Sequence, residues 1–231
     1  MRVLALLILA TVFSFGPSDR ANGQSFDDGG LWFAALGNGD LNATTFTGRR
    51  LKWWFDAHYR LLDDADGFNQ SIVRPGLGVD LGNNAAAWAG YGWIRTSPVT
   101  GDDFDEHRLF QQFTWSPSCC GLKFLHRSRF EQRLVETGDD TGLRWRELLR
   151  VQGRPGPRGF SPVIWDEVFY NLNNTDFGAR AGFDQNRFFI GLRFPERSKL
   201  FKSEVGYLNQ VIDSPNGPTR VNHIASINFF F

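Results

Sequence analysis

The sequence predicts an all-β protein, a single antiparallel up-and-down β-barrel of 10–12 strands that spans a membrane. Most of the chain alternates between apolar and polar residues over stretches of ten or more positions, which is the period of a β-strand. No run approaches the roughly 18 apolar residues that a membrane helix requires. The chain holds 23 Phe, 8 Trp and 25 Gly, yet its mean hydropathy is −0.31. A membrane barrel can combine many aromatic residues with a low mean hydropathy, because only alternate residues of its strands face lipid.

Residues 1–23 have the features of a secretory signal peptide. Met1 and Arg2 give a positive start, a mostly apolar run follows, and small residues stand near Gly23, where a signal peptidase would cut. We therefore expect export through a cleaved signal, with residues 24–231 forming the barrel.

Alternation places the strands in order along the chain. The predicted segments are 31–38, 51–61, 70–81, 85–96, 106–115, 122–135, 143–152, 162–172, 185–194, 200–212 and 221–231. The first is the weakest, because glycines interrupt it. Bacterial barrels usually have an even number of strands, so we expect ten if this segment fails, or twelve if another lies near the N-terminus. Pro75 cannot donate to a strand ladder and predicts a bulge.

The direction of the faces follows from charge. The segment 122–135 carries four basic side chains on one face. At roughly 2–4 kcal/mol for each Arg or Lys near the bilayer midplane, turning that face to lipid would cost on the order of 10 kcal/mol, comparable with the stability of a whole domain. The opposite faces carry aromatic residues near their ends, such as Trp53 and Tyr59, as membrane barrels do at the two interfaces. A soluble lipocalin-like carrier, with the aromatic face inward, is the less favoured alternative.

We therefore expect a basic lumen. Its predicted basic members are Lys52, Arg60, Arg74, Arg108, Lys123, Arg127, Arg129, Arg133, Arg144, Arg146, Arg150, Arg187 and Arg193, and its predicted acidic partners are Asp56, Glu106, Glu131, Glu167 and Glu204. The loops between strands are acidic instead, with Asp63, Asp64, Asp66, Asp102, Asp103, Asp105, Asp139 and Asp140. The net charge of zero is thus the sum of a basic lumen and acidic loops.

The last segment predicts where the protein resides. Ile227, Phe229 and Phe231 share its apolar face, and a terminal aromatic residue resembles the C-terminal signal of bacterial outer-membrane barrels. Expected partners are the barrel-assembly machinery, outer-membrane lipid and lipopolysaccharide, with no nucleic acid. If Phe231 lies in the periplasm, the loops at Asp63, Ser97, Glu136, Asn173 and Asp213 are extracellular.

Several strings resemble one known family. They are residues 74–78 (RPGLG), 91–96 (YGWIRT), 106–112 (EHRLFQQ), 129–133 (RFEQR), 166–173 (DEVFYNLN), 182–187 (GFDQNR) and 206–210 (GYLNQ), together with Asn222-His223 in the last segment. They resemble the bacterial outer-membrane barrels catalogued as domain of unknown function 2490 (DUF2490). The resemblance implies a fold and a location, and it brings no catalytic residues.

Three functional classes remain open. Arg–Glu pairs could fill the lumen, since interior charges must be paired, or rings of Arg and Lys could line a narrow anion-preferring pore. A lipid-modifying enzyme is the third, with His58, His223 and Ser226 as the candidates. His223 and Ser226 fall on opposite faces of one strand, and no G-x-S-x-G or metal-spaced His pattern occurs. We therefore predict no catalytic residue, cofactor or metal site.

Overall fold

The computed structural model describes residues 26–65, 67–98, 101–196, 200–214 and 217–231, so the predicted signal peptide and Asp66 lie outside it. The strands are β1 (Phe26–Thr44), β2 (Arg50–Leu62), β3 (Gly67–Gly82), β4 (Ala85–Thr96), β5 (Phe104–Trp115), β6 (Ser118–Cys119), β7 (Leu122–Val135), β8 (Thr141–Gln152), β9 (Ser161–Asn171), β10 (Gly182–Arg193), β11 (Lys202–Ile212) and β12 (Arg220–Phe230). Over the described residues, no helix is long and apolar enough to cross a membrane.

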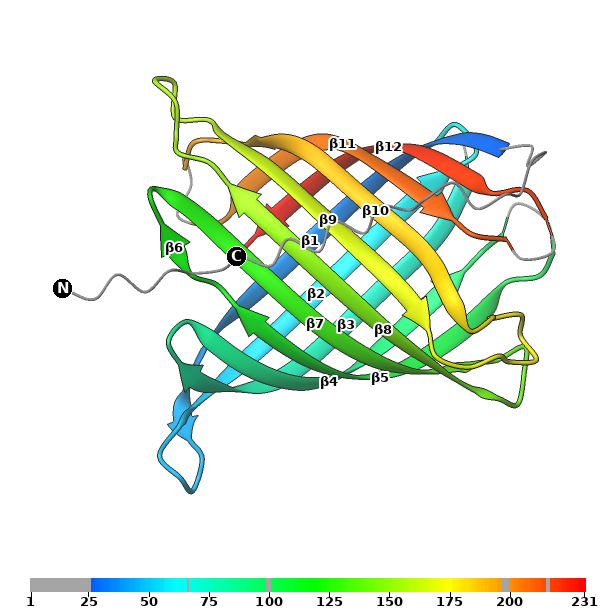
Figure 1. The fold of residues 1–231 in the computed structure, drawn as a ribbon, viewed down its shortest axis with the longest axis horizontal. Helices are drawn as coiled ribbons and strands as arrows, with labels where there is room; N and C mark the ends of the chain where they lie inside the picture. The colour runs from blue at the N-terminus through cyan, green and yellow to red at the C-terminus, as the bar shows by residue number, and fades with distance from the viewer. Residues whose placement is uncertain (1–25, 66, 99–100, 197–199, 215–216) are drawn as a thin grey trace.

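The strands form one sheet that closes into a barrel, with the strands tilted along its length (Figure 1). Each long strand pairs with its sequence neighbours, and β5 pairs with β7. The two-residue β6 lies in the connection between those strands and pairs only with β7. The wall therefore contains eleven long strands, which confirms the predicted all-β barrel.

The expectation of an even strand number was wrong. β1 is 19 residues long and pairs with both β2 and β12. An eleventh strand in an up-and-down order runs in the same direction as the first, so the closing pair β1–β12 is parallel, from Phe26↔Arg220 to Leu36↔Phe230. All other pairs along the wall are antiparallel. The glycines that weakened the first segment in the sequence do not break the strand.

The barrel has two distinct ends. Phe231 lies at the end that also holds the connections after β1, β3, β5, β8 and β10, which we call the C-terminal end. The start of β1 lies at the opposite end, with the connections after β2, β4, β7, β9 and β11. Pro75 does not form the predicted bulge. It faces Phe55 in a regular register, and the β2–β3 shift lies near Arg60 instead.

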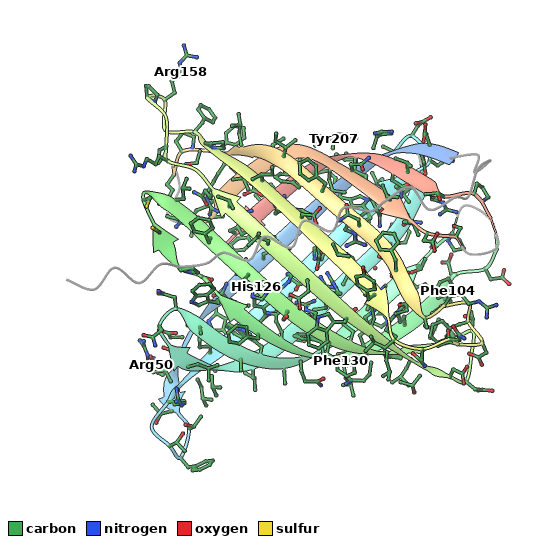
Figure 2. All side chains as sticks on the ribbon, viewed as in Figure 1. Arg50, Phe104, His126, Phe130, Arg158 and Tyr207 are labelled. Atoms are coloured by element: carbon green, nitrogen blue, oxygen red, sulfur yellow. The ribbon has the colours of Figure 1, made fainter. Side chains whose placement is uncertain are left out.

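Alternation turns one set of side chains into the barrel and the other set outward (Figure 2). One apolar cluster lies inside β1 and β9–β12 and consists of Trp32, Val163, Phe189, Leu208 and Ile224. The Phe189 ring fits because Gly191 and Gly206 carry no side chain; a Cβ at either position would come within 2.5 Å of the ring. Most of the other buried side chains are polar or charged, including Glu167, Arg187 and Glu204 on these same strands.

Candidate functional site

The predicted lumen residues point into the barrel. Arg60, Arg74, Arg108, Arg127, Arg129, Arg144, Arg146 and Arg187 are buried there, together with Asp56, Glu106, Glu131, Glu167 and Glu204. Arg133, Arg150 and Arg193 line cavities within the lumen, and Lys52 pairs with Asp40 near the C-terminal end. Lys123 is exposed at that end.

A continuous ion-pair network crosses the middle of the lumen. Its members, which we call the central layer, are Asp56, Arg74, Arg127, Arg129, Glu131, Arg144, Arg146 and Glu167. Arg74 contacts Asp56 at 2.6 Å, and Arg129 lies 3.8 Å from Asp56 and 3.7 Å from Glu131. Glu131 also binds Arg144 at 2.7 Å and Arg146 at 2.6 Å. Glu167 binds Arg146 and Arg127, each at 2.7 Å.

The central layer is closely packed and leaves only a small cavity beside it, of about 130 Å³. Arg129 and Glu131 are 0% exposed, and Asp56 is 1% exposed. Gln112 accepts two hydrogen bonds from Arg129, and the rings of Phe110 and Phe169 lie 4.5 Å and 4.4 Å from the guanidinium carbons of Arg129 and Arg146. Arginine is suited to this arrangement, because its planar fork serves two carboxylates and also stacks on aromatic rings. The centre of the lumen is thus packed with paired side chains.

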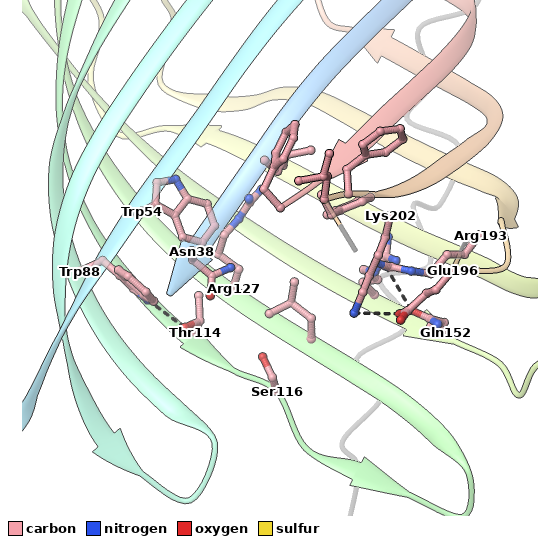
Figure 3. A pocket seen from close by; sticks show the side chains of 17 residues that line it. Asn38, Trp54, Trp88, Thr114, Ser116, Arg127, Gln152, Arg193, Glu196 and Lys202 are labelled. Atoms are coloured by element: carbon pink, nitrogen blue, oxygen red, sulfur yellow. Dashed lines mark hydrogen bonds and ion pairs between the residues drawn. The ribbon is translucent and has the colours of Figure 1, made fainter. Parts of the chain in front are cut away.

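One cavity lies toward the C-terminal end, with a volume of about 880 Å³. Figure 3 shows Trp54 and Trp88 on one side of it and Lys202, Glu196, Gln152 and Arg193 on the other. Its cations have nearby partners: Arg150 binds Glu204 at 2.7 Å, Lys202 binds Glu196 at 2.8 Å, and Arg193 reaches Gln152 at 3.5 Å.

A second cavity, of about 570 Å³, lies toward the opposite end; we call it the vestibule. Three of the four carboxylates that line it are engaged, and the fourth is that of Asp63. Glu106 binds Arg108 and Arg133, each at 2.6 Å, and Asp184 binds Arg144 at 3.2 Å. Asp28 accepts hydrogen bonds from backbone amides of the β2–β3 connection.

Arg60 and Arg187 differ from the other arginines whose side chains line the interior of the vestibule, whereas Arg220 is exposed at its rim. Arg60 and Arg187 lie over the ring of Trp32, with guanidinium carbons 4.0 Å and 5.1 Å from its centroid. Arg60 donates to Gln70 at 2.7 Å, and within the described part of the chain neither guanidinium forms an ion pair with a carboxylate. Seven buried side-chain polar atoms among the described residues have no hydrogen-bond partner, and three of them lie together here: Arg60 Nε, Arg187 Nε and Trp32 Nε1. We call these three residues the Arg60–Trp32–Arg187 cluster. The other four atoms are Gln112 Nε2, Arg127 Nε and Arg129 Nη1, in or beside the central layer, and Asn222 Oδ1.

Buried polar groups in proteins are nearly always hydrogen-bonded, and buried charges are paired. Three unsatisfied donors in one cluster, two of them on cations, therefore indicate a place for an acceptor that carries negative charge. Glu106, Asp184 and Asp28 are held by other arginines or backbone amides, and Asp63 forms no ion pair with either arginine among the described residues.

The enzyme candidates do not meet. His58 points inward, where its Nε2 lies 2.9 Å from Arg74 and 3.2 Å from Asp56. His223 points outward and shares a 2.6 Å hydrogen bond with the Tyr207 hydroxyl, whereas Ser226 is buried inside. Among the residues that the structure describes, no three His, Cys, Asp or Glu side chains form a group able to hold a metal ion. Cys119 and Cys120 are exposed free thiols in a turn.

The fold and lumen define a class, an eleven-stranded closed barrel with an ion-paired interior. Residues 29–222 match the family described as protein of unknown function (DUF2490), and the chain belongs to this family. It is also similar to an uncharacterized protein of Methylorubrum extorquens, with 34% identity over 229 residues that cover 97% of this chain and 96% of the relative. No solved structure matches the chain.

Sequence reasoning missed part of the site. Trp32 was not placed in the lumen, because its segment contains several Gly and Ala residues and therefore shows little alternation between apolar and polar residues. Gln112 and Asp184 were passed over as partners of Arg129 and Arg144, because contacts across a barrel join strands that the sequence separates widely. Alternation could have found Trp32 and Gln112, since both have inward parity.

Proposed function

We propose that the protein is an integral outer-membrane barrel whose lumen is closed at its middle and whose vestibule binds a small oxyanion. The outer face supports membrane insertion. It exposes large apolar side chains around the barrel, among them Leu77, Leu109, Leu149, Ile190 and Leu192. The long strands contain 11 to 19 residues, enough for tilted strands that need about 9–11 residues to span a bilayer.

Aromatic side chains lie at two levels of this outer face. Trp53, Trp115, Phe194 and Phe231 lie near the C-terminal end of the barrel, whereas Trp93, Trp145 and Tyr170 lie toward the opposite end. Two girdles of this kind flank the apolar band of membrane barrels. Phe231, Phe229 and Ile227 have outward parity on β12, as an assembly signal read by the barrel-assembly machinery would require.

The location is tested by fractionation. The expressed full-length chain should lose residues 1–23 and sediment with outer-membrane lipid and lipopolysaccharide. With Phe231 in the periplasm, a protease added to intact cells should cut only in the connections of the opposite end. A protein that remains soluble in the periplasm would contradict the proposal and favour the lipocalin-like alternative.

The Arg60–Trp32–Arg187 cluster carries the proposal of anion binding. Guanidinium groups form short, often bidentate hydrogen bonds with phosphate and carboxylate, and these bonds are stronger than neutral ones. The vestibule leaves about 570 Å³ in front of the cluster, which suits a small ligand. The packed central layer argues against a conducting pore, because an ion would have to displace paired and fully buried side chains.

Calorimetric titration of the purified barrel with inorganic phosphate tests this proposal. We expect one site per chain, and we expect Arg187→Gln to weaken it by about tenfold or more, because a charge-assisted hydrogen bond contributes about 1.5–3 kcal/mol. Arg193→Gln is the matched control, since that arginine lines the other cavity and also lacks a close carboxylate. Equal loss in both variants, or no binding by the wild type, would contradict the proposal.

A further inference from the structure

The outer face carries a row of polar side chains at the middle of the barrel wall. The row, which we call the outer polar stripe, consists of Gln111 on β5, His126 and Ser128 on β7, Glu147 on β8 and Asp166 on β9; His126 lies nearest the C-terminal end, opposite Trp115 in the register. Glu147 is the seventh of twelve residues in β8, and Asp166 is the sixth of eleven in β9. Ser128 faces Glu147 in the register, and Glu147 faces Val168, two residues from Asp166.

The stripe is hydrogen-bonded within itself and remains open outward. Glu147 accepts from Ser128 and from Trp145 Nε1, at 2.6 Å in the latter case, and its Oε2 lies 2.9 Å from His126 Nε2. The side chains of His126 and Glu147 are still 41% and 42% exposed. Asp166 accepts from Asn186 at 2.9 Å. Within the described residues, no Lys or Arg forms an ion pair with either carboxylate.

This arrangement conflicts with a lipid environment, and the inference therefore rests on the proposed membrane location. Mid-strand residues on the outer face lie farthest from water on both sides of a bilayer. Charged side chains there are unfavourable, and polar residues inside membranes usually face other protein groups. Glu147 and Asp166 therefore need a protein surface over them.

We propose that the outer polar stripe is the contact surface for a second copy of this chain. Two barrels inserted in the same direction can be related by a two-fold axis parallel to their length, which brings equal heights together. With the axis between β7 and β8, Ser128 and His126 of one copy lie opposite Glu147 of the other. On the flanks, the Gln111 amide lies on the same side as Asp166 of the partner copy.

The hydrogen-bond donors of one copy thus face the carboxylates of the other across the two-fold axis. The stripe is therefore complementary to the same stripe on a second copy. The amide pair Gln111 and Gln132, which exchange hydrogen bonds of 3.4 Å and 3.0 Å, extends the donor side. Interhelical contacts in membranes use polar side chains in the same way, as attachments between apolar surfaces.

A hydrolytic site at Ser128 is less well supported. His126 and Ser128 both bind Glu147 and form no hydrogen bond with each other in the described structure, so His126 does not act as a base on the hydroxyl. The backbone amides on both sides take part in the β7–β8 ladder, which leaves no pair of donors for an oxyanion.

The mass of the detergent-solubilised barrel tests the dimer, measured by light scattering after size exclusion. We expect twice the chain mass for the wild type and for His223→Leu, an outward polar residue on the far side of the barrel. We expect a single chain mass for Glu147→Leu, with folding checked by heat-modifiable electrophoretic mobility.

Cross-linking in native membranes keeps the test valid if Glu147→Leu fails to fold. In a Cys119→Ser/Cys120→Ser background, Leu149→Cys on β8 should form disulfide-linked dimers and Val205→Cys on β11 should not. A folded, membrane-inserted wild type that stays monomeric overturns the dimer and leaves the location intact. A wild type absent from the outer-membrane fraction overturns the location itself. Fatty-acid release from phosphatidylglycerol vesicles by a monomer, lost in Ser128→Ala, overturns the dimer in favour of hydrolysis.

Discussion

The central layer and the Arg60–Trp32–Arg187 cluster are both buried and arginine-rich, yet their charges are balanced differently. Three carboxylates in the central layer serve five arginines through contacts of 2.6 to 3.8 Å. In the cluster two arginines share an aromatic ring and no carboxylate. Buried arginines that form ion pairs can simply fill the interior of a barrel. Buried arginines without a carboxylate partner are unfavourable, and the stability of the rest of the fold must offset their cost. This difference separates a structural region from a binding region.

The largest expected effect is on stability in the central layer. Glu131→Gln should lower the free energy of unfolding by about 3–5 kcal/mol, because it removes a fully buried carboxylate and leaves Arg146 with Glu167 alone and Arg144 with Asp184 alone. Urea titration of the barrel in phospholipid vesicles measures the change. Glu196→Gln is the matched control; its ion pair with Lys202 is exposed, so the expected change is at most about 1 kcal/mol. Equal losses of unfolding free energy in the two variants would show that the ion pairs of the central layer contribute no more than exposed ion pairs do.

Conductance distinguishes a closed lumen from an open one. The wild-type barrel in a planar bilayer should give no stepwise current, because the buried ion pairs of the central layer leave only a cavity of about 130 Å³ at the middle of the lumen. The double variant Arg129→Ala/Glu131→Ala removes both fully buried members of the layer and should produce steps. Anion-selective steps from the wild type would favour the narrow pore and contradict the closed lumen.

A smaller effect is expected at Trp32. Trp32→Leu keeps an apolar side chain but removes the ring beneath both guanidinium groups, whose attraction contributes about 0.5–2 kcal/mol. Phosphate affinity should fall by about fivefold, less than in Arg187→Gln, while the barrel remains folded. Unchanged affinity would mean that the ring does not orient the arginines.

The same comparison explains what could be predicted from sequence. Alternation identified the barrel and the inward parity of residues such as Arg129 and Glu131, because parity depends only on the strand period. It could not separate Arg146, which has two carboxylates, from Arg187, which has none. That distinction depends on contacts between strands on different sides of the lumen.

The strand count and the outer polar stripe show two further limits. The even-number rule misled because closure depends on whether β1 can pair with two neighbours, and an isolated segment does not reveal this. Glu147 stood visibly among Leu143, Trp145 and Leu149, on the face expected to meet lipid. A charged residue on the apolar face of a strand is as informative as the alternation itself, because contact with lipid alone is unfavourable for it.

Anomalous diffraction from crystals grown with selenate tests the central claim most directly, since selenium locates the oxyanion without reference to activity. We predict a selenium peak within hydrogen-bonding reach of both Arg60 and Arg187, and none in the central layer. A vestibule without that peak, or selenate bound instead among the central-layer arginines, would contradict it.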